Sequence, residues 1–179
     1  NSNSLIKYPK FTNIVFKNFD SLIGGRIRGS VSGSASIQAE QGVFYRICFQ
    51  SSLFQGYGLS ETAAGATVQS YFSTNFQGVG SCLTDNMFIY LRDAGSYSIK
   101  DKPFPRGEIV VIGDAVFRNY YGMEEDPQSV QIRKELNIKD DTWGIYCSGD
   151  VGQFNFITGE LEIIDRINNI IKLSQGEFV

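Results

Sequence analysis

A seven-residue segment, GYGLSET at positions 56–62, places an aromatic ring, a hydroxyl and a carboxylate on one glycine-containing turn. Tyr57 can stack on a flat ring, Ser60 can hydrogen-bond to a phosphate oxygen, and Glu61 can bind Mg²⁺ through its carboxylate oxygens. Glycine permits the tight backbone conformation that such a turn needs. A solvated turn with a packed tyrosine explains the same residues equally well, because Gly, Ser and Thr are common in loops. The segment therefore indicates a nucleotide site as one of two interpretations.

The residue types that are missing narrow the chemistry further. The sequence contains no histidine, which removes Ser-His-Asp and Cys-His catalysis and the usual general base near neutral pH. Residues 24–29, GGRIRG, match neither GxGxxG nor GxxxxGK[ST], so their spacing excludes a phosphate loop. Any reaction should therefore depend on metal-assisted charge stabilisation and on positioning of the substrates.

The composition is that of a folded globular chain, with 42% hydrophobic and 20% charged residues. A net charge of −3 gives no reason to expect nucleic acid as a partner. No apolar run approaches the roughly 20 residues that a membrane-spanning helix needs. Three widely spaced cysteines suit a reducing compartment better than a disulfide framework.

The first part of the chain predicts a strand–helix–strand unit. Residues 26–32 alternate like a strand, 37–50 fit a helix, and a short strand at 54–58 leads into the GYGLSET turn. Ser36 is the expected N-cap of the helix. The apolar residues expected on its buried face are Ile37, Val43, Phe44, Ile47 and Cys48.

After about residue 80 the pattern changes to short β runs separated by Gly, Asp and Asn. One helix interrupts these runs near 126–136, where Asp126 can cap the first turn and Pro127 suits the first helical position. The expected strands cover residues 87–91, 108–112, 143–147, 153–156 and 161–164. The fold class is therefore mixed α/β: part of an α/β layered subdomain, then a small β-rich, distorted barrel-like subdomain.

Residues 56–62 resemble the Y-G-L-T-E-T signature of the acyl-adenylate-forming superfamily of AMP-binding enzymes, with Ser60 in place of Thr. The resemblance implies that Tyr57 stacks on adenine and that Gly58 belongs to the nucleotide-binding turn. It also implies that Ser60 contacts phosphate and that Glu61 binds Mg²⁺, which makes these two the expected catalytic residues.

A second resemblance lies upstream, at SGSAS, residues 32–36, which is similar to the family's S-G-G-A-P turn after a G-G-R-x-R strand. It implies that the backbone of Gly33, Ser34 and Ala35 lies along the adenylate and the acyl pocket. Ser34 and Ser36 stand where the family usually has Gly and Pro. A strand-to-helix turn with a helix cap is a compatible interpretation, and for Ser36 an equally good one.

Two more segments extend the match. Residues 143–150 resemble G-W-x-x-T-G-D, which implies that Asp150 accepts hydrogen bonds from the ribose hydroxyls. A turn aspartate is the alternative. Residues 106–109 and 120–122 resemble R-G-E-I and Y-Y-G, and we interpret them as structural, a strand followed by a turn with packed aromatic rings.

The last residues, 165–179, resemble the signature D-R-K-K-x-x-x-K-L-x-x-G-E-Y-V. Its K-L-x-x-G-E ending is typical of the eukaryotic-type long-chain fatty acyl branch. The resemblance implies that Asp165 is the hinge between the large and small domains and that Arg166 contacts the nucleotide. It also implies that Gly176 lies on the loop facing the CoA thiol. Asn168 replaces a lysine of the pattern.

The combined resemblance identifies the chain as an internal segment of a long-chain fatty acid–CoA ligase that uses ATP, Mg²⁺, CoA and a long-chain fatty acid. Residues 1–80 would be the C-terminal part of an α/β AMP-binding subdomain and 81–164 a small β-rich subdomain. Residues 165–179 would be the hinge and the start of the C-terminal domain. The family's phosphate loop and late lysine fall outside these residues, so the chain alone is expected to be inactive. The complete protein is expected in the cytoplasm, with peripheral membrane association because its substrate is a lipid.

Two alternatives remain. One is a non-catalytic module that binds nucleotide or a partner protein, although intact Tyr57, Glu61 and Asp150 argue against decay. The other is a different adenylating enzyme, such as a luciferase, a coumarate ligase or a peptide-synthetase domain. The K-L-x-x-G-E ending argues against the second alternative.

Overall fold

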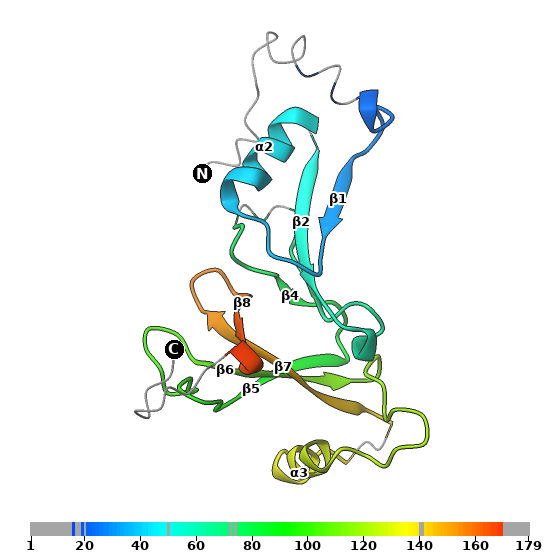
Figure 1. Ribbon diagram of the computed structural model, residues 1–179, viewed down its shortest axis with the longest axis vertical. Coiled ribbons are helices and arrows are strands. Elements are labelled where there is room, and N and C mark those ends of the chain that lie inside the picture. The colour runs from blue at the N-terminus through cyan, green and yellow to red at the C-terminus, as the bar shows by residue number, and fades with distance from the viewer. Residues whose placement is uncertain are drawn as a thin grey trace.

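The computed structural model describes residues 16–169 except 17, 18, 20, 50, 72, 74, 140 and 141. These residues form two four-stranded sheets that lie one after the other along the long axis of the molecule (Figure 1). The expected mixed α/β fold is confirmed. In the described part of the chain, no helix is both long and apolar enough to cross a membrane.

The first sheet has the order β1-β2-β3-β4. Strands β1, Gly29–Ser32, and β2, Ser52–Tyr57, run parallel and are joined through helix α2, Ala39–Phe49. Parallel strands require such a crossover, so this unit fits the expected strand–helix–strand pattern. Two short strands, β3 at Thr67–Val68 and β4 at Ser81–Cys82, add antiparallel to its free edge.

Helix α2 differs from the prediction at its start and in its buried face. The helix begins at Ala39, and the N–H of Gly42 already bonds to the carbonyl of Gln38, so Ser36 is not the cap. Val43 and Phe44 are exposed. The helix instead packs through Gly42, whose missing side chain makes room for the ring of Phe76.

That contact explains why the predicted apolar face is only partly correct: Cys48 is fully buried and Ile47 is half-buried, but Val43 and Phe44 are exposed. Residues spaced three, four and seven positions after Gly42 lie on the same side of a helix. Tyr45, Arg46 and Phe49 occupy those positions and are half-buried, and the guanidinium of Arg46 lies 4.4 Å from the centre of the Phe76 ring. The packing of the Phe76 ring, rather than the spacing of apolar residues within α2, therefore determines which side of the helix faces inward.

The second sheet is an antiparallel meander of four strands. These are β5 at Met87–Arg92, β6 at Arg106–Gly113, β7 at Gly144–Asn155 and β8 at Glu160–Arg166. The expected strands 143–147 and 153–156 are two parts of β7, because the residues between them continue the strand through an irregularity in its pairing with β6. Among the described residues the sheet does not close into a barrel.

Strand β6 is buried on both faces and divides the hydrophobic core in two. Ile109 and Val111 face the core that contains Met87 and Leu161. On the other face, Val110 and Ile112 pack with Ile145 and with Ile132 of helix α3, Pro127–Glu135. Alternate side chains of one strand thus hold α3 on one side and the junction with the first sheet on the other.

Residues 78–80 join the two sheets by pairing with β8. The N–H of Val79 donates to the carbonyl of Leu161 at 2.7 Å, and the N–H of Leu161 donates to Gly80 at 2.9 Å. Gly80 has φ +83°, and a Cβ there would collide with the backbone of Val68. The connection therefore requires glycine and fixes the two sheets to each other by backbone hydrogen bonds.

Helix α3 has the predicted N-terminus, with Asp126 as N-cap and Pro127 in the first turn. The Asp126 carboxylate accepts a hydrogen bond from the Ser129 N–H at 3.0 Å. We expect Asp126→Ala to lower the free energy of unfolding by about 1 kcal/mol, because that N–H loses its partner. Urea denaturation measures the change.

The matched control for this substitution is Asp126→Asn, which keeps a capping oxygen and should unfold near the original urea concentration. An equal decrease in the free energy of unfolding in both variants would show that the Asp126 side chain does not act as a cap.

Candidate functional site

The structure brings together two predicted nucleotide residues that are far apart in sequence. The hydroxyl of Tyr57, at the end of β2, donates a hydrogen bond to Oδ2 of Asp150 on β7 at 2.8 Å. The Asp150 side chain lies in the junction between the sheets, and the residue is only 5% exposed. The pair predicted to contact adenine and ribose is therefore one hydrogen-bonded unit.

Arg166 completes this unit from the neighbouring strand. Asp150 and Arg166 are directly opposite in the β7–β8 pairing, and the arginine Nε lies 3.1 Å from Oδ1 of the aspartate. The arginine side chain is 69% exposed. It therefore neutralises a buried carboxylate while its guanidinium stays accessible to an anionic ligand.

The Tyr57 hydroxyl is the donor in its hydrogen bond with Asp150, because a carboxylate only accepts. Desolvation raises the pKa of the Tyr57 phenol far above its usual value, and the adjacent Asp150 carboxylate raises it further. The phenol therefore keeps its proton, and the bond to Asp150, to a higher pH than an exposed tyrosine would. This hydrogen bond fixes the orientation of the Tyr57 side chain.

The GYGLSET segment forms a compact turn that ends in one turn of 3-10 helix, Ser60–Thr62. Thr62 is buried, and its Oγ1 accepts a hydrogen bond from the N–H of Leu59 at 2.9 Å. Gly58 packs so closely on the Ala64 carbonyl that no Cβ fits there. The turn is therefore anchored by Thr62 and Gly58, and it leaves Ser60 exposed.

Glu61, the predicted metal ligand, is held by the segment that follows β6. The Tyr120 hydroxyl donates to Oε1 of Glu61 at 2.5 Å, and the Phe117 N–H donates to the Glu61 carbonyl at 2.8 Å. The hydrogen bond to Glu61 is the main cause of a raised Tyr120 pKa. Tyr120, interpreted from the sequence as structural, therefore contacts a residue of the predicted site directly.

The donor set can be compared with what Mg²⁺ requires. In the part of the chain that the structure describes, no group of three or more His, Cys, Asp or Glu side chains could hold a metal ion. Mg²⁺ in nucleotide sites takes one or two protein carboxylates, with substrate phosphates and water as the other ligands. The half-buried Glu61 fits that arrangement as a single protein ligand.

The turn at Gly33, Ser34 and Ala35 follows β1 at the same edge of the sheet where β2 ends. Ligands of parallel sheets bind outside the carboxyl ends of the strands, so this edge suits a nucleotide. Ser34 has φ +68°, a conformation that favours glycine. Ser34 therefore holds, at some strain, a backbone conformation that glycine adopts more readily. The Gln55 side chain ties the turn down by accepting from the Ile37 N–H at 3.0 Å.

Two hollows lie beside these residues. A groove of about 610 Å³ runs between residues 36–40, which lead into and begin α2, and Ile164 on β8. A smaller pocket of about 330 Å³ lies beside the Tyr120–Glu61 contact and is lined by Phe117, Tyr120 and Tyr146. The linings of both hollows leave out Tyr57 and Asp150.

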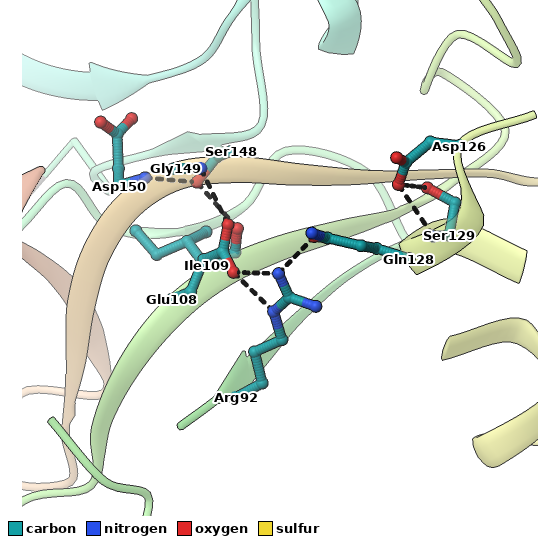
Figure 2. A network of polar contacts seen from close by, with 9 residues as sticks. All are labelled: Arg92, Glu108, Ile109, Asp126, Gln128, Ser129, Ser148, Gly149 and Asp150. Carbon is teal, nitrogen blue, oxygen red and sulfur yellow. Dashed lines mark hydrogen bonds and ion pairs between the residues drawn. The ribbon is translucent and has the colours of Figure 1, made fainter. Parts of the chain in front are cut away.

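One group that the sequence reasoning did not single out supports Asp150 from behind. The buried carboxylate of Glu108 accepts a hydrogen bond from the Gly149 N–H at 3.1 Å and pairs with Arg92 (Figure 2). In the sequence, Glu108 stands out only as part of the R-G-E-I segment, which we interpret as a structural strand. The residues around it do not indicate a contact with Gly149.

The expected hinge and CoA-side residues are only partly described. Asp165 lies near the end of β8, where its Oδ1 accepts from the Arg166 N–H at 2.7 Å and from the Asn169 side chain at 3.2 Å. Gly176 lies outside the described residues. The hinge assignment therefore stays a prediction.

Comparison with known proteins decides the family. Residues 4–121 match the family described as AMP-binding enzyme, which covers more than half of the chain. The chain belongs to the AMP-binding enzymes.

Relatives refine this placement. Long chain acyl-CoA synthetase 8 of Arabidopsis thaliana is 38% identical over 167 residues, covering 93% of this chain and 22% of the relative. Fatty acyl-CoA synthetase A of Dictyostelium discoideum is 38% identical over 172 residues, which cover 96% of this chain and 24% of the relative. The predicted resemblance to long-chain synthetases is confirmed. The chain spans about a quarter or less of the length of these AMP-binding enzymes.

A solved structure supports the fold. The A-PCP didomain of carboxylic acid reductase from Segniliparus rugosus, solved in complex with AMP, has a TM-score of 0.64 and 27% identity. The match covers 97% of this chain and 22% of that one. The fold of this chain is therefore similar to that of part of this AMP-bound didomain.

The Tyr57–Asp150 contact gives a direct test of the junction. Tyr57→Phe should lower the free energy of unfolding by about 1–3 kcal/mol, because the buried Asp150 carboxylate loses a donor. Urea denaturation of the chain measures the loss. Tyr121→Phe is the matched control, since the Tyr121 side chain is fully exposed, and it should change little.

The same variant should show a defined pH dependence. Above pH 10 the unfolded chain loses the Tyr57 proton while the folded chain keeps it, so the original protein loses stability relative to Tyr57→Phe. The difference between the two should therefore narrow as pH rises above about 10. A constant difference would contradict the raised pKa of Tyr57.

Proposed function

We propose that the protein containing this chain is a long-chain fatty acid–CoA ligase. A carboxylate oxygen of the fatty acid attacks the α-phosphorus of ATP, and the bond to pyrophosphate breaks. The CoA sulfur then attacks the acyl carbon of the acyl-AMP, AMP leaves, and the thiol proton passes to solvent. The observation that carries the proposal is the hydrogen-bonded Tyr57–Asp150 pair in a chain 38% identical to long-chain synthetases.

The nucleoside would lie over this pair. Tyr57 would stack on adenine, because its hydrogen bond to Asp150 already fixes the orientation of the ring. Asp150 would accept the ribose hydroxyls with lone pairs that its two partners leave available. Arg166 would contact the nucleotide with its exposed guanidinium, since its Nε already pairs with Asp150.

The phosphates would lie toward the two turns at the edge of the first sheet. Ser60 is exposed and can donate to a phosphate oxygen, while Gly58 and the backbone of Gly33, Ser34 and Ala35 line the approach. Glu61 would hold Mg²⁺, which when bound neutralises charge that develops on the phosphates. The Tyr120 hydroxyl would keep the Glu61 carboxylate in position.

The remaining parts of the function rest on the sequence match. Preference for a long acyl chain would come from an apolar tunnel, since each buried CH₂ contributes about 0.8 kcal/mol. Asp165 would serve as the domain hinge and Gly176 would face the CoA thiol. A cytoplasmic location agrees with the three free cysteines, and peripheral membrane contact would follow from the lipid substrate.

The test measures palmitate-, ATP- and CoA-dependent acyl-CoA formation by the complete protein and by single variants. Asp150→Ala should lower kcat/KM for ATP about 100-fold through the lost ribose contacts. Glu61→Gln should lower kcat and shift the Mg²⁺ requirement upward. Removal of Mg²⁺ with a chelator should stop the reaction.

Tyr121→Phe provides the control and should keep the original kinetics. Folding of each variant is checked by circular dichroism. A folded Asp150→Ala protein with unchanged kinetics for ATP would contradict the proposed site, and inactivity of the complete protein on every fatty acid tried would contradict the reaction.

A further inference from the structure

The segment that carries Asp150 is a large irregularity in β7. Glu108 of β6 lies opposite Val151, and Val110 lies opposite Cys147, so Ile109 alone faces the three residues 148–150. Gly149 has φ +72° and leaves the regular ladder there. A bulge of this size loses ladder hydrogen bonds, and other groups must replace them.

Side chains make the replacement bonds. The Gly149 N–H donates to Oε1 of Glu108 at 3.1 Å. The Ser148 hydroxyl donates to the Ile109 carbonyl at 2.8 Å and accepts from the Asp150 N–H at 3.1 Å. Every residue of the Ser148-Gly149-Asp150 segment is therefore tied to β6 or to the segment itself through a named group (Figure 2).

Glu108 is suited to act as a fixed anchor because it is buried and paired. The residue is 4% exposed, and its Oε2 lies 2.5 Å from the Arg92 guanidinium. Arg92 in turn donates to Gln128 at the start of α3. A buried carboxylate with a partner on each oxygen cannot move without leaving a charge or a donor unsatisfied.

The geometry also separates the anchor from the functional side chain. Glu108 lies on the face of β6 that α3 covers, on the same side as Val110, whereas Asp150 reaches Tyr57 at the other face. Figure 2 shows Asp150 pointing away from Glu108, with Gly149 between them. Glu108 therefore holds the backbone of the bulge from behind and does not touch the nucleotide side.

We propose that Glu108 is a positioning residue that sets Asp150 for the ribose hydroxyls through the Gly149 N–H. The inference rests on the proposed function of Asp150 and extends it to a residue that lies behind the site. Its consequence is that nucleotide discrimination at the ribose depends on a carboxylate on the opposite face of the sheet.

The substitution that tests this is Glu108→Gln. A glutamine has one acceptor oxygen, so it cannot serve both the Gly149 N–H and the Arg92 guanidinium. The measured quantity, in the complete protein, is the ratio of kcat/KM for ATP to kcat/KM for 2′,3′-dideoxy-ATP. We expect this ratio to fall about tenfold or more, mainly through KM for ATP, because the dideoxy nucleotide lacks the hydroxyls that Asp150 binds.

Glu162→Gln is the matched control. Glu162 is also buried, at 7% exposed, lies in the same sheet and accepts two side-chain hydrogen bonds, from Gln153 and Asn155. It should lose comparable stability in thermal melts and keep the ribose ratio. An equal fall of the ratio in both variants would overturn the proposal, because the effect would then be a general loss of sheet integrity.

A second variant covers the case in which Glu108→Gln fails to fold. Ser148→Ala removes the hydroxyl that ties the same segment to Ile109, and it leaves the Glu108–Arg92 pair intact. It should also lower the ribose ratio. An unchanged ratio in a folded Ser148→Ala protein would overturn the inference, because the position of Asp150 would then not depend on the bonds that hold this segment to β6.

Asp150→Ala separates this inference from the proposed function. One outcome is that Asp150→Ala removes the preference for ATP over 2′,3′-dideoxy-ATP while the Glu108 and Ser148 variants keep that preference. In that case Asp150 binds the ribose as proposed, and the positioning role of Glu108 is wrong. If a folded Asp150→Ala protein keeps the ratio, Asp150 does not hold the ribose, and both proposals fail.

Discussion

The Asp150 carboxylate is buried where two sheets meet, and a buried charge must be paired and hydrogen-bonded to be tolerated. Each partner comes from a different part of the fold: Tyr57 from the end of the first sheet and Arg166 from β8. The backbone pairing of residues 78–80 with β8 keeps those parts together. The relative placement of the sheets therefore determines whether this one carboxylate can be accommodated.

This dependence connects stability with function. A group that binds ribose must keep lone pairs available, yet a buried carboxylate needs donors before any ligand arrives. Tyr57 and Arg166 provide those donors, and the exposed side of Arg166 leaves a route for an anionic ligand. The turn at Ser60 and Glu61 follows the same principle, since Thr62 and Gly58 fix the backbone while Ser60 stays exposed.

Local signals in the sequence predicted the elements that depend on local contacts. Asp126 and Pro127 mark the start of α3 because capping involves neighbouring residues only. The sequence pattern wrongly assigns Val43 and Phe44 to the buried side of α2, because Phe76, thirty-four positions beyond Gly42, packs where the side chain is smallest. Likewise, β7 was read as two strands because Ser148, Gly149 and Asp150 are typical turn residues, and only the pairing with β6 shows that they form a bulge.

The same limit applies to the site. The types of Tyr57, Glu61 and Asp150 pointed to nucleotide chemistry, and the match to AMP-binding enzymes gave them expected roles. Their contacts could not be read from the sequence, since Tyr57 and Asp150 are 93 positions apart. Glu108 was missed for a related reason: its contact with Gly149 exists only because the strand register changes between Glu108 and Val110.

The number of extra residues in β7 at this register change determines which side chains of the strand face the core. Three residues of β7 face one residue of β6, so the strand contains two more residues than regular pairing would need. Side chains along a strand alternate with a period of two, and an even-numbered insertion preserves which side chains point inward. Cys147 before the bulge and Val151 after it therefore keep the same facing, and the core around β7 is not inverted. The segment that carries Asp150 therefore lies in the middle of a core strand without changing which side chains of that strand face the core.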